Sequence, residues 1–239
     1  MEFLFFLVAF FSEVIGTTVG FGSSTIFLPF ALFFVDFKTA LVLVAIFHIF
    51  GNLSRITFFR YGLDKKILIQ FGIISVLFTL IGALFVSYVP QNLFKAVLGI
   101  FLIIYSIILI WKENFKIKPI RTNTLIGGGL SGFFAGLIGT GGALRSSFLT
   151  SYGLSKEKYI ATSAAIALAV DFTRVPTYFF QGFLQKNFYW YIPVLLPIAL
   201  LGSFTGKKII NKIPQKKFKK IVLIAIFIIG IQFIYNYFI

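Results

Sequence analysis

The chain has 239 residues, of which 59% are hydrophobic and only 12% are charged. Soluble globular domains carry about 25% charged residues, and a soluble core of this size cannot bury so much apolar surface. These values exclude an ordinary soluble enzyme, a disordered chain and a secreted disulfide scaffold. The remaining class is an all-α polytopic membrane protein. The absence of cysteine and the single histidine also exclude thiolate chemistry and histidine-rich metal sites.

The first half begins with an apolar segment that stops after about one helix length. The sequence Gly-Phe-Gly-Ser-Ser (20–24) interrupts it, and a short apolar stretch then runs to Val35. A spanning helix needs about 20 apolar residues. Complete spans are predicted at 39–59, 67–89 and 93–111. The N-terminus lacks the positive region of a cleavable signal peptide, so we expect the first segment to be retained.

The second half repeats this plan after a basic stretch. A glycine-rich segment, 124–138, is interrupted by Gly-Thr-Gly-Gly-Ala (139–143), and complete spans are predicted at 160–180, 188–206 and 218–238. We therefore divide the chain into three parts: a first transmembrane repeat (1–111), a basic cytoplasmic linker (112–123) and a second transmembrane repeat (124–239).

The two halves can be aligned as an internal repeat. The motif Pro-Gln-x-x-Phe-Lys occurs at 90–95 and again at 214–219. With a shift of 119 residues, the glycine breaks coincide and several polar residues have partners. The matched pairs are Gly20 and Gly139, Gly22 and Gly141, Asn52 and Asp171, and Arg55 and Arg174. Each repeat is thus expected to contain a broken or re-entrant helical pair followed by three transmembrane helices.

The distribution of basic residues predicts the orientation of the repeats. If each broken segment enters the membrane and returns, the loops 60–66, 112–121, 153–159 and 207–220 fall on one side and carry 16 of the 22 Lys and Arg residues. Cytoplasmic loops are enriched in Lys and Arg. Counting each broken segment as a single span would place the basic loops on opposite sides. We therefore predict inverted repeats with both termini on the non-cytoplasmic side.

Three stretches of the sequence resemble the sulfite exporter TauE/SafE family of membrane permeases. They are GFGSSTIFLPF (20–30), GLIGTGGALRSSFL (136–149) and GLSKEKYIATSAAIAL (153–168). In the first half, Ser23 and Ser24 replace the glycines of the family pattern. The resemblance covers nearly the whole chain and implies a transporter of small sulfur-containing anions such as sulfite, sulfonates or sulfoacetate, in a bacterial-type plasma (inner) membrane.

The two glycine breaks are candidate anion-binding segments. Unwound backbone survives in a bilayer only where it is buried in protein or lines a cavity, and helix N-termini offer free N–H groups to anions. The alternative is close helix packing through small residues, which suits the glycine-rich segment 127–136. Phe21 is a candidate cavity wall. The candidate residues in the breaks are Gly20, Phe21, Gly22, Ser23, Ser24, Thr25, Gly139, Thr140, Gly141 and Gly142.

Three arginines lie within apolar segments, where a charged side chain usually faces the interior of the helix bundle. Arg145 directly follows the second break, and its planar guanidinium suits the oxygens of a sulfonate or sulfite. Arg55 either binds substrate together with Asn52 or extends its guanidinium to the membrane surface. Arg174 lies three residues after Asp171, on the same helix face.

A smaller set of polar residues is assigned to coupling or to substrate hydroxyl contacts. Glu13, His48 and Asp171 are candidates for proton coupling or gating; the alternatives are an internal ion pair for Asp171 and hydrogen-bonded packing for His48. The hydroxyls of Thr162 and Ser163 either face an anion or bond back to their own helix.

The sequence thus predicts a secondary transporter that binds a small anion at broken helices near the midplane. The expected partners are that anion, a proton or sodium ion, and membrane lipid; no nucleic acid, cofactor or metal is expected. An intramembrane enzyme is disfavoured because no nucleophile-and-base set is found. A non-transporting membrane assembly factor and a transporter of another small anion, such as a carboxylate, remain as alternatives. Oligomeric state, substrate and direction of transport are left open.

Overall fold

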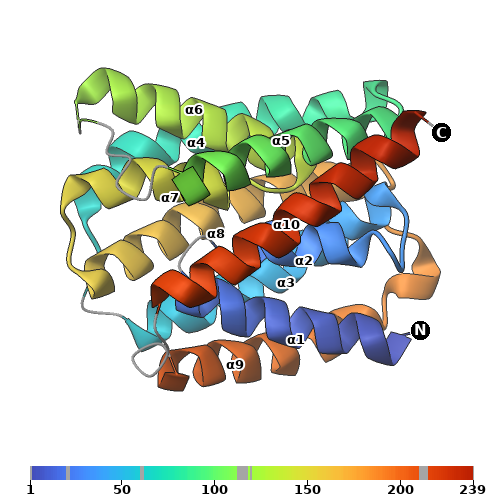
Figure 1. Ribbon diagram of the computed structural model, residues 1–239, viewed down its shortest axis with the longest axis horizontal. Coiled ribbons are helices and arrows are strands. Elements are labelled where there is room, and N and C mark those ends of the chain that lie inside the picture. Colours follow the sequence, from blue (N-terminus) through green and yellow to red (C-terminus); the bar gives the residue numbers. More distant parts are fainter. Residues whose placement is uncertain are drawn as a thin grey trace.

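A computed structural model describes residues 2–19, 22–59, 62–111, 118, 120–209 and 215–238, and these residues form a bundle of α-helices (Figure 1). The first half contains α1 (Glu2–Val19), α2 (Ser24–Ala31), α3 (Phe37–Phe58), α4 (Lys65–Phe85) and α5 (Gln91–Trp111). The second half contains α6 (Arg121–Ile138), α7 (Gly142–Leu149), α8 (Lys156–Phe180), α9 (Tyr191–Ile209) and α10 (Gln215–Phe238). Of the predicted linker 112–123, the structure describes 118 and 120–123.

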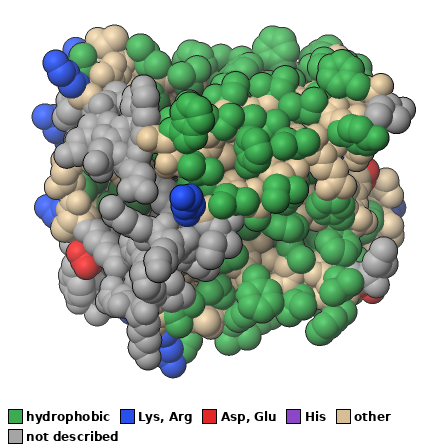
Figure 2. All heavy atoms as spheres, in the orientation of Figure 1, with side chains coloured by type: hydrophobic (Ala, Val, Ile, Leu, Met, Phe, Trp, Pro, Cys, Tyr) green, Lys and Arg blue, Asp and Glu red, His purple; other side chains and the backbone are tan. Residues whose placement is uncertain are grey.

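The lengths and the surface of the helices are those of a multi-pass membrane protein. Four of the described helical stretches are long and apolar enough to cross a membrane: Phe37–Phe58, Lys65–Tyr88, Gln91–Trp111 and Lys186–Ile209. Hydrophobic side chains cover most of the face shown in Figure 2, whereas most Lys and Arg side chains lie at one end of it. The predicted all-α polytopic fold is confirmed.

Each half opens with a helix that is interrupted at the predicted glycine-rich segment. In both halves the first helix has 18 residues and the second has 8, so each pair is a long helix followed by a short one. Gly22 and Gly139 have φ angles of +85° and +76°, a left-handed conformation that is cheap only for glycine. In Figure 1, α2 leads back toward the end of the molecule at which α1 begins.

Helix packing in one half has its counterpart in the other. α1 packs against α9 and α6 packs against α4, while α3 contacts α9 and α8 contacts α4. Two further pairs, α3 with α8 and α5 with α10, join helices at corresponding positions of the two halves. α5 and α10 run in opposite directions, and both chain termini lie at the same end of the molecule (Figure 1).

Glycines bring α4 and α6 into close contact. A Cβ atom built on Gly128, Gly132 or Gly136 would lie 2.9, 2.1 and 2.2 Å, respectively, from a backbone carbonyl oxygen of α4. The hydroxyls of Ser75 and Thr79 donate hydrogen bonds to the carbonyl oxygens of Gly128 and Gly132 across this contact. The segment 127–136 is therefore a packing surface, as the small-residue alternative predicted.

Candidate functional site

A small polar cavity lies where the two helix breaks approach each other. The hydroxyl oxygens of Thr25 and Thr140, one beside each break, are 2.8 Å apart and hydrogen-bonded. The cavity has about 20 Å³ of free space, which is room for about one water molecule. Five of the residues predicted to bind substrate line it: Gly22, Asn52, Arg55, Arg145 and Ser163.

Arg145 is the lining residue with the least compensation of its charge. It lies in the first turn of α7, directly after the second break, and only 4% of it is exposed. Its Nε donates a hydrogen bond to the Ser163 hydroxyl at 3.0 Å. Within the described part of the chain, no carboxylate lies within 4.0 Å of its guanidinium. Because a buried charge without a partner is unfavourable by several kcal/mol, this position strongly favours an added negative charge.

Arg55, in contrast, already has its partners. Its Nη2 lies 2.5 Å from Oε1 of Glu13, so the two side chains form a buried ion pair between α3 and α1. Nε donates to the Thr17 hydroxyl at 3.1 Å, and Nη1 donates to the Asn52 side-chain oxygen at 2.8 Å. A longer contact of 3.3 Å joins Nη2 to the Ser23 hydroxyl in the first break. Arg55 is 5% exposed and does not extend to the membrane surface.

The carboxylate of Glu13 is held from three helices. Besides Arg55, it accepts hydrogen bonds from the hydroxyls of Thr17 on α1 and Ser203 on α9, at 3.2 and 2.5 Å. Gly51 and Gly202 leave the space for it, because a Cβ built on either would lie within 2.7 Å of Glu13 side-chain atoms. Glu13 thus fixes Arg55 and joins α1, α3 and α9.

Arg174 forms the internal pair with Asp171 that their spacing predicts. Its Nε and Nη2 atoms lie 2.8 and 2.7 Å from Oδ1 of Asp171. Its Nη1 donates to the carbonyl oxygens of Ala135 and Gly139 at 3.0 and 2.7 Å, at the C-terminal end of α6. Carbonyls at a helix end have no partner within the helix, so Arg174 stabilises the second break. It does not line the cavity.

His48 contacts Asp171 from α3. Its Nδ1 lies 2.8 Å from Oδ2 of Asp171, which also accepts a 3.2 Å hydrogen bond from the Asn52 amide. Nε2, on the other side of the ring, is buried and has no hydrogen-bond partner among the described residues. It faces the first break, since a Cβ built on Gly22 would lie 3.1 Å from it.

The other predicted residues lie around the cavity or away from it. The Thr162 hydroxyl bonds to the backbone of the loop before α4, accepting from the N–H of Asp64 at 2.9 Å, and so faces away from the cavity. Ser24, Gly139, Thr140, Gly141 and Gly142 are buried at the breaks but do not line the cavity. Gly20 and Phe21 lie outside the described residues.

Several residues that line the cavity or support it were not predicted from the sequence. Gly16, Thr17, Ile160 and Ala164 complete the cavity wall, and Ser203 holds Glu13 from a distant helix. Thr17 was recognisable, because it follows Glu13 by four residues and so shares its helix face. The sequence carries no comparable signal for Ser203.

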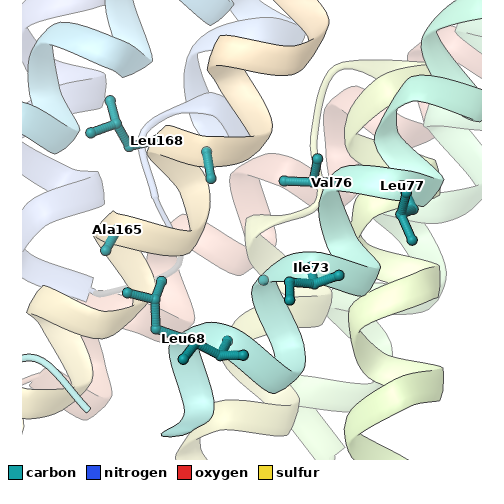
Figure 3. A pocket seen from close by; sticks show the side chains of 9 residues that line it. Leu68, Ile73, Val76, Leu77, Ala165 and Leu168 are labelled. Atoms are coloured by element: carbon teal, nitrogen blue, oxygen red, sulfur yellow. The ribbon is translucent and has the colours of Figure 1, made fainter. Parts of the chain in front are cut away.

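A larger pocket, of about 470 Å³, lies between α4 and α8 but has a different character. Figure 3 shows the side chains that line it, with Leu68, Ile73 and Val76 on α4 and Ala165 and Leu168 on α8. All nine lining residues are apolar or glycine, so the pocket offers no side-chain donor to an anion. The cavity at the breaks is therefore the better candidate for an anion site.

Fold and site together define a polytopic helical membrane protein with a buried cationic cavity between two helix breaks. The sequence profile of the family described as Sulfite exporter TauE/SafE matches residues 5–233 of the chain. The chain therefore belongs to this family of membrane transporters, and the resemblance inferred from the sequence is confirmed. Comparison with individually curated proteins finds no significant match.

Proposed function

We propose that this protein is a secondary permease for small sulfur-containing anions and that the anion binds to Arg145 in the cavity at the two breaks. The observation that carries this proposal is the buried Arg145 guanidinium without a carboxylate partner among the described residues. A guanidinium presents several N–H donors in one plane, and these match the oxygens of a sulfite or sulfonate group. The Ser163 hydroxyl holds one edge of the guanidinium and leaves its two Nη groups for the anion.

Transport by this site requires a change of conformation. The cavity has room for about one water molecule, so an anion of several heavy atoms enters only when the surrounding helices separate. We propose that the two halves are inverted repeats that rock against each other, alternately opening the cavity to each side. Two observations support this arrangement: the helix contacts of one half correspond to those of the other, and α5 and α10 run in opposite directions.

The proposed orientation places both termini outside the cytoplasm and the basic loops inside. Most of the described Lys and Arg side chains visible in Figure 2 gather at one end of the molecule, opposite the termini in Figure 1. Cytoplasmic loops carry this excess of positive charge. The repeats would then consist of 1–111 and 124–239, joined by the cytoplasmic linker 112–123.

Uptake of labelled sulfite into proteoliposomes tests the proposal. Removing one partner of a buried charge interaction costs roughly 2–5 kcal/mol, so Arg145→Ala should reduce uptake about thirtyfold or more. Arg121→Ala is the matched control, because Arg121 is exposed at the start of α6. Unchanged uptake by a folded Arg145→Ala protein removes Arg145 from the site, and equal uptake of acetate and sulfite contradicts the sulfur-anion assignment.

A further inference from the structure

The buried charged side chains around the cavity sum to one net positive charge. Glu13 pairs with Arg55 and Asp171 pairs with Arg174, whereas Arg145 has no carboxylate within 4.0 Å among the described residues. With His48 neutral, the cluster therefore carries one uncompensated positive charge. A bound monoanion neutralises it, but a dianion reverses the imbalance and leaves one negative charge in a region where charge is poorly solvated.

His48 lies where a proton on its ring would neutralise the extra negative charge of a dianion. Its Nε2 and the Nη2 atom of Arg145 approach the backbone of Gly22 together, since a Cβ built there would lie 3.1 Å from the first and 3.9 Å from the second. Gly22 itself lines the cavity. The imidazole nitrogen and the guanidinium therefore face the same part of the first break.

The ring's other contacts determine what Nε2 can do. Nδ1 lies 2.8 Å from the Asp171 carboxylate, which can only accept a hydrogen bond when ionised, so we assign the proton of the neutral ring to Nδ1. Nε2 then presents a lone pair, which repels an anion's oxygen. A proton on Nε2 converts it into a donor and adds the second positive charge.

The other charged groups near the ring are already paired with one another. Arg174 on α8 is bound to Asp171, and Glu13 on α1, which reaches α3 at Gly51, is bound to Arg55. The short helix α2 brings no titratable side chain. Two atoms of these side chains have no hydrogen-bond partner in the described part of the chain: Oε2 of Glu13, whose other oxygen is bound to Arg55, and Nε2 of His48. Of the two, Nε2 approaches Gly22 together with Nη2 of Arg145.

We propose that the anion and any proton bound with it together carry one negative charge, which neutralises the cluster: a monoanion such as a sulfonate binds alone, whereas a dianion such as sulfite binds together with one proton on Nε2 of His48. The proton comes from water, and no covalent bond of the anion changes. This inference rests on the proposed anion site at Arg145. It makes His48 the residue that sets the charge type of the substrate and links dianion transport to proton movement.

His48 is the only histidine of the chain, which permits a direct test on the unaltered protein. Protein labelled with ¹⁵N-histidine and free of a histidine tag is placed in lipid nanodiscs at pH 8.5, where free sulfite is a dianion. Calorimetry establishes binding of sulfite and of methanesulfonate, and the ring ¹⁵N resonances report the protonation of Nε2. We expect Nε2 to become protonated on saturation with sulfite and to remain unprotonated with methanesulfonate.

Each outcome separates the two proposals. If both anions bind and Nε2 remains unprotonated with sulfite, or becomes protonated with both, the His48 assignment is overturned while the Arg145 site stands. Failure of methanesulfonate to bind where sulfite binds also overturns the charge rule. Absence of sulfite binding removes the proposed function itself.

A variant gives a second, independent measurement. His48→Gln keeps a side chain of similar size that cannot carry the proton. We expect its affinity for sulfite at pH 8.5 to fall about tenfold or more, and its affinity for methanesulfonate to fall less than about threefold. Equal losses for the two anions would show that His48 contributes packing alone.

Discussion

The two helix breaks share one backbone plan but differ in charge. Each consists of an 18-residue helix, a glycine with positive φ and an 8-residue helix. Each also has a buried arginine from the next long helix: Arg55 beside the first break and Arg174 beside the second. The second break alone adds Arg145, whose counterpart under the 119-residue shift is the buried, apolar Ile26.

This difference separates two arginines with carboxylate partners from the one arginine that we propose binds the anion. Arg55 is matched by Glu13, and Arg174 is matched by Asp171 and by two carbonyl oxygens of α6. Both therefore hold the breaks in place at no net charge. Arg145 has no arginine at the matching position of the first half, and no carboxylate of the described residues lies within 4.0 Å of its guanidinium. Two similar helix breaks thus enclose one asymmetric cationic position, which we propose as the anion site.

The largest expected loss of stability follows from making the second half more like the first. Asp171→Asn gives the second half the residue type that the first half has at the matching position, Asn52. The variant leaves Arg174 as a buried charge without its carboxylate partner. We expect the free energy of unfolding in mixed micelles to fall by about 3–5 kcal/mol. The exposed helix cap Asp36→Asn is the control and should change it by less than about 0.5 kcal/mol, because Asn caps a helix as well as Asp. Equal stability of the two variants would contradict the supporting role of this pair.

A smaller effect on stability, but a clear effect on transport, is expected from Gly22→Ala. An alanine at a φ of +85° is unfavourable by roughly 1–2 kcal/mol, and its Cβ would lie 3.1 Å from Nε2 of His48. Gly153→Ala is a matched control, because Gly153 has a φ of +63° but nothing within 4 Å of its Cβ position.

Comparing these two glycine variants separates backbone strain from the site. Both should lose similar stability by thermal unfolding. We expect anion uptake per folded protein to fall about tenfold for Gly22→Ala, equivalent to about 1.4 kcal/mol, and to stay within about twofold of wild type for Gly153→Ala. Similar uptake by both variants would indicate that the first break does not contribute to the site.

The smallest effect is expected at the contact between the two breaks. Thr140→Val removes the 2.8 Å hydrogen bond to Thr25 without a large change in shape. Its loss should lower the free energy of unfolding by about 1 kcal/mol. Thr57→Val is the control, because it removes a hydrogen bond to the carbonyl of Leu53 on an exposed face of α3. We expect it to have a smaller effect. A larger loss of unfolding free energy for Thr57→Val than for Thr140→Val would mean that the breaks are not joined through Thr140.

Structural features that depend on local sequence patterns were predictable from the sequence. Apolar length predicted the long helices, glycine clusters predicted the breaks, and the three-residue spacing of Asp171 and Arg174 predicted their pair. The glycines of 127–136 also indicated close packing. Each of these features depends on residues within a few helical turns of one another.

Contacts between distant helices could not be predicted in the same way. Three buried arginines and two buried acids allow several pairings, and the sequence does not state that Glu13 binds Arg55, 42 residues away. Nor does it show that Thr162 bonds to the loop before α4 while its neighbour Ser163 lines the cavity. Only the packing of α1, α3, α7 and α8 assigns these partners and leaves Arg145 with no carboxylate of the described residues within 4.0 Å.

We propose above all that one anion binds to Arg145 where the two breaks meet. Selenite is the selenium analogue of sulfite, and its anomalous X-ray scattering would locate it in crystals of the protein. We expect a single selenium peak within hydrogen-bonding reach of the Arg145 guanidinium, beside Ser163 and Gly22. A peak elsewhere, with the cavity at Arg145 empty, would contradict this proposal.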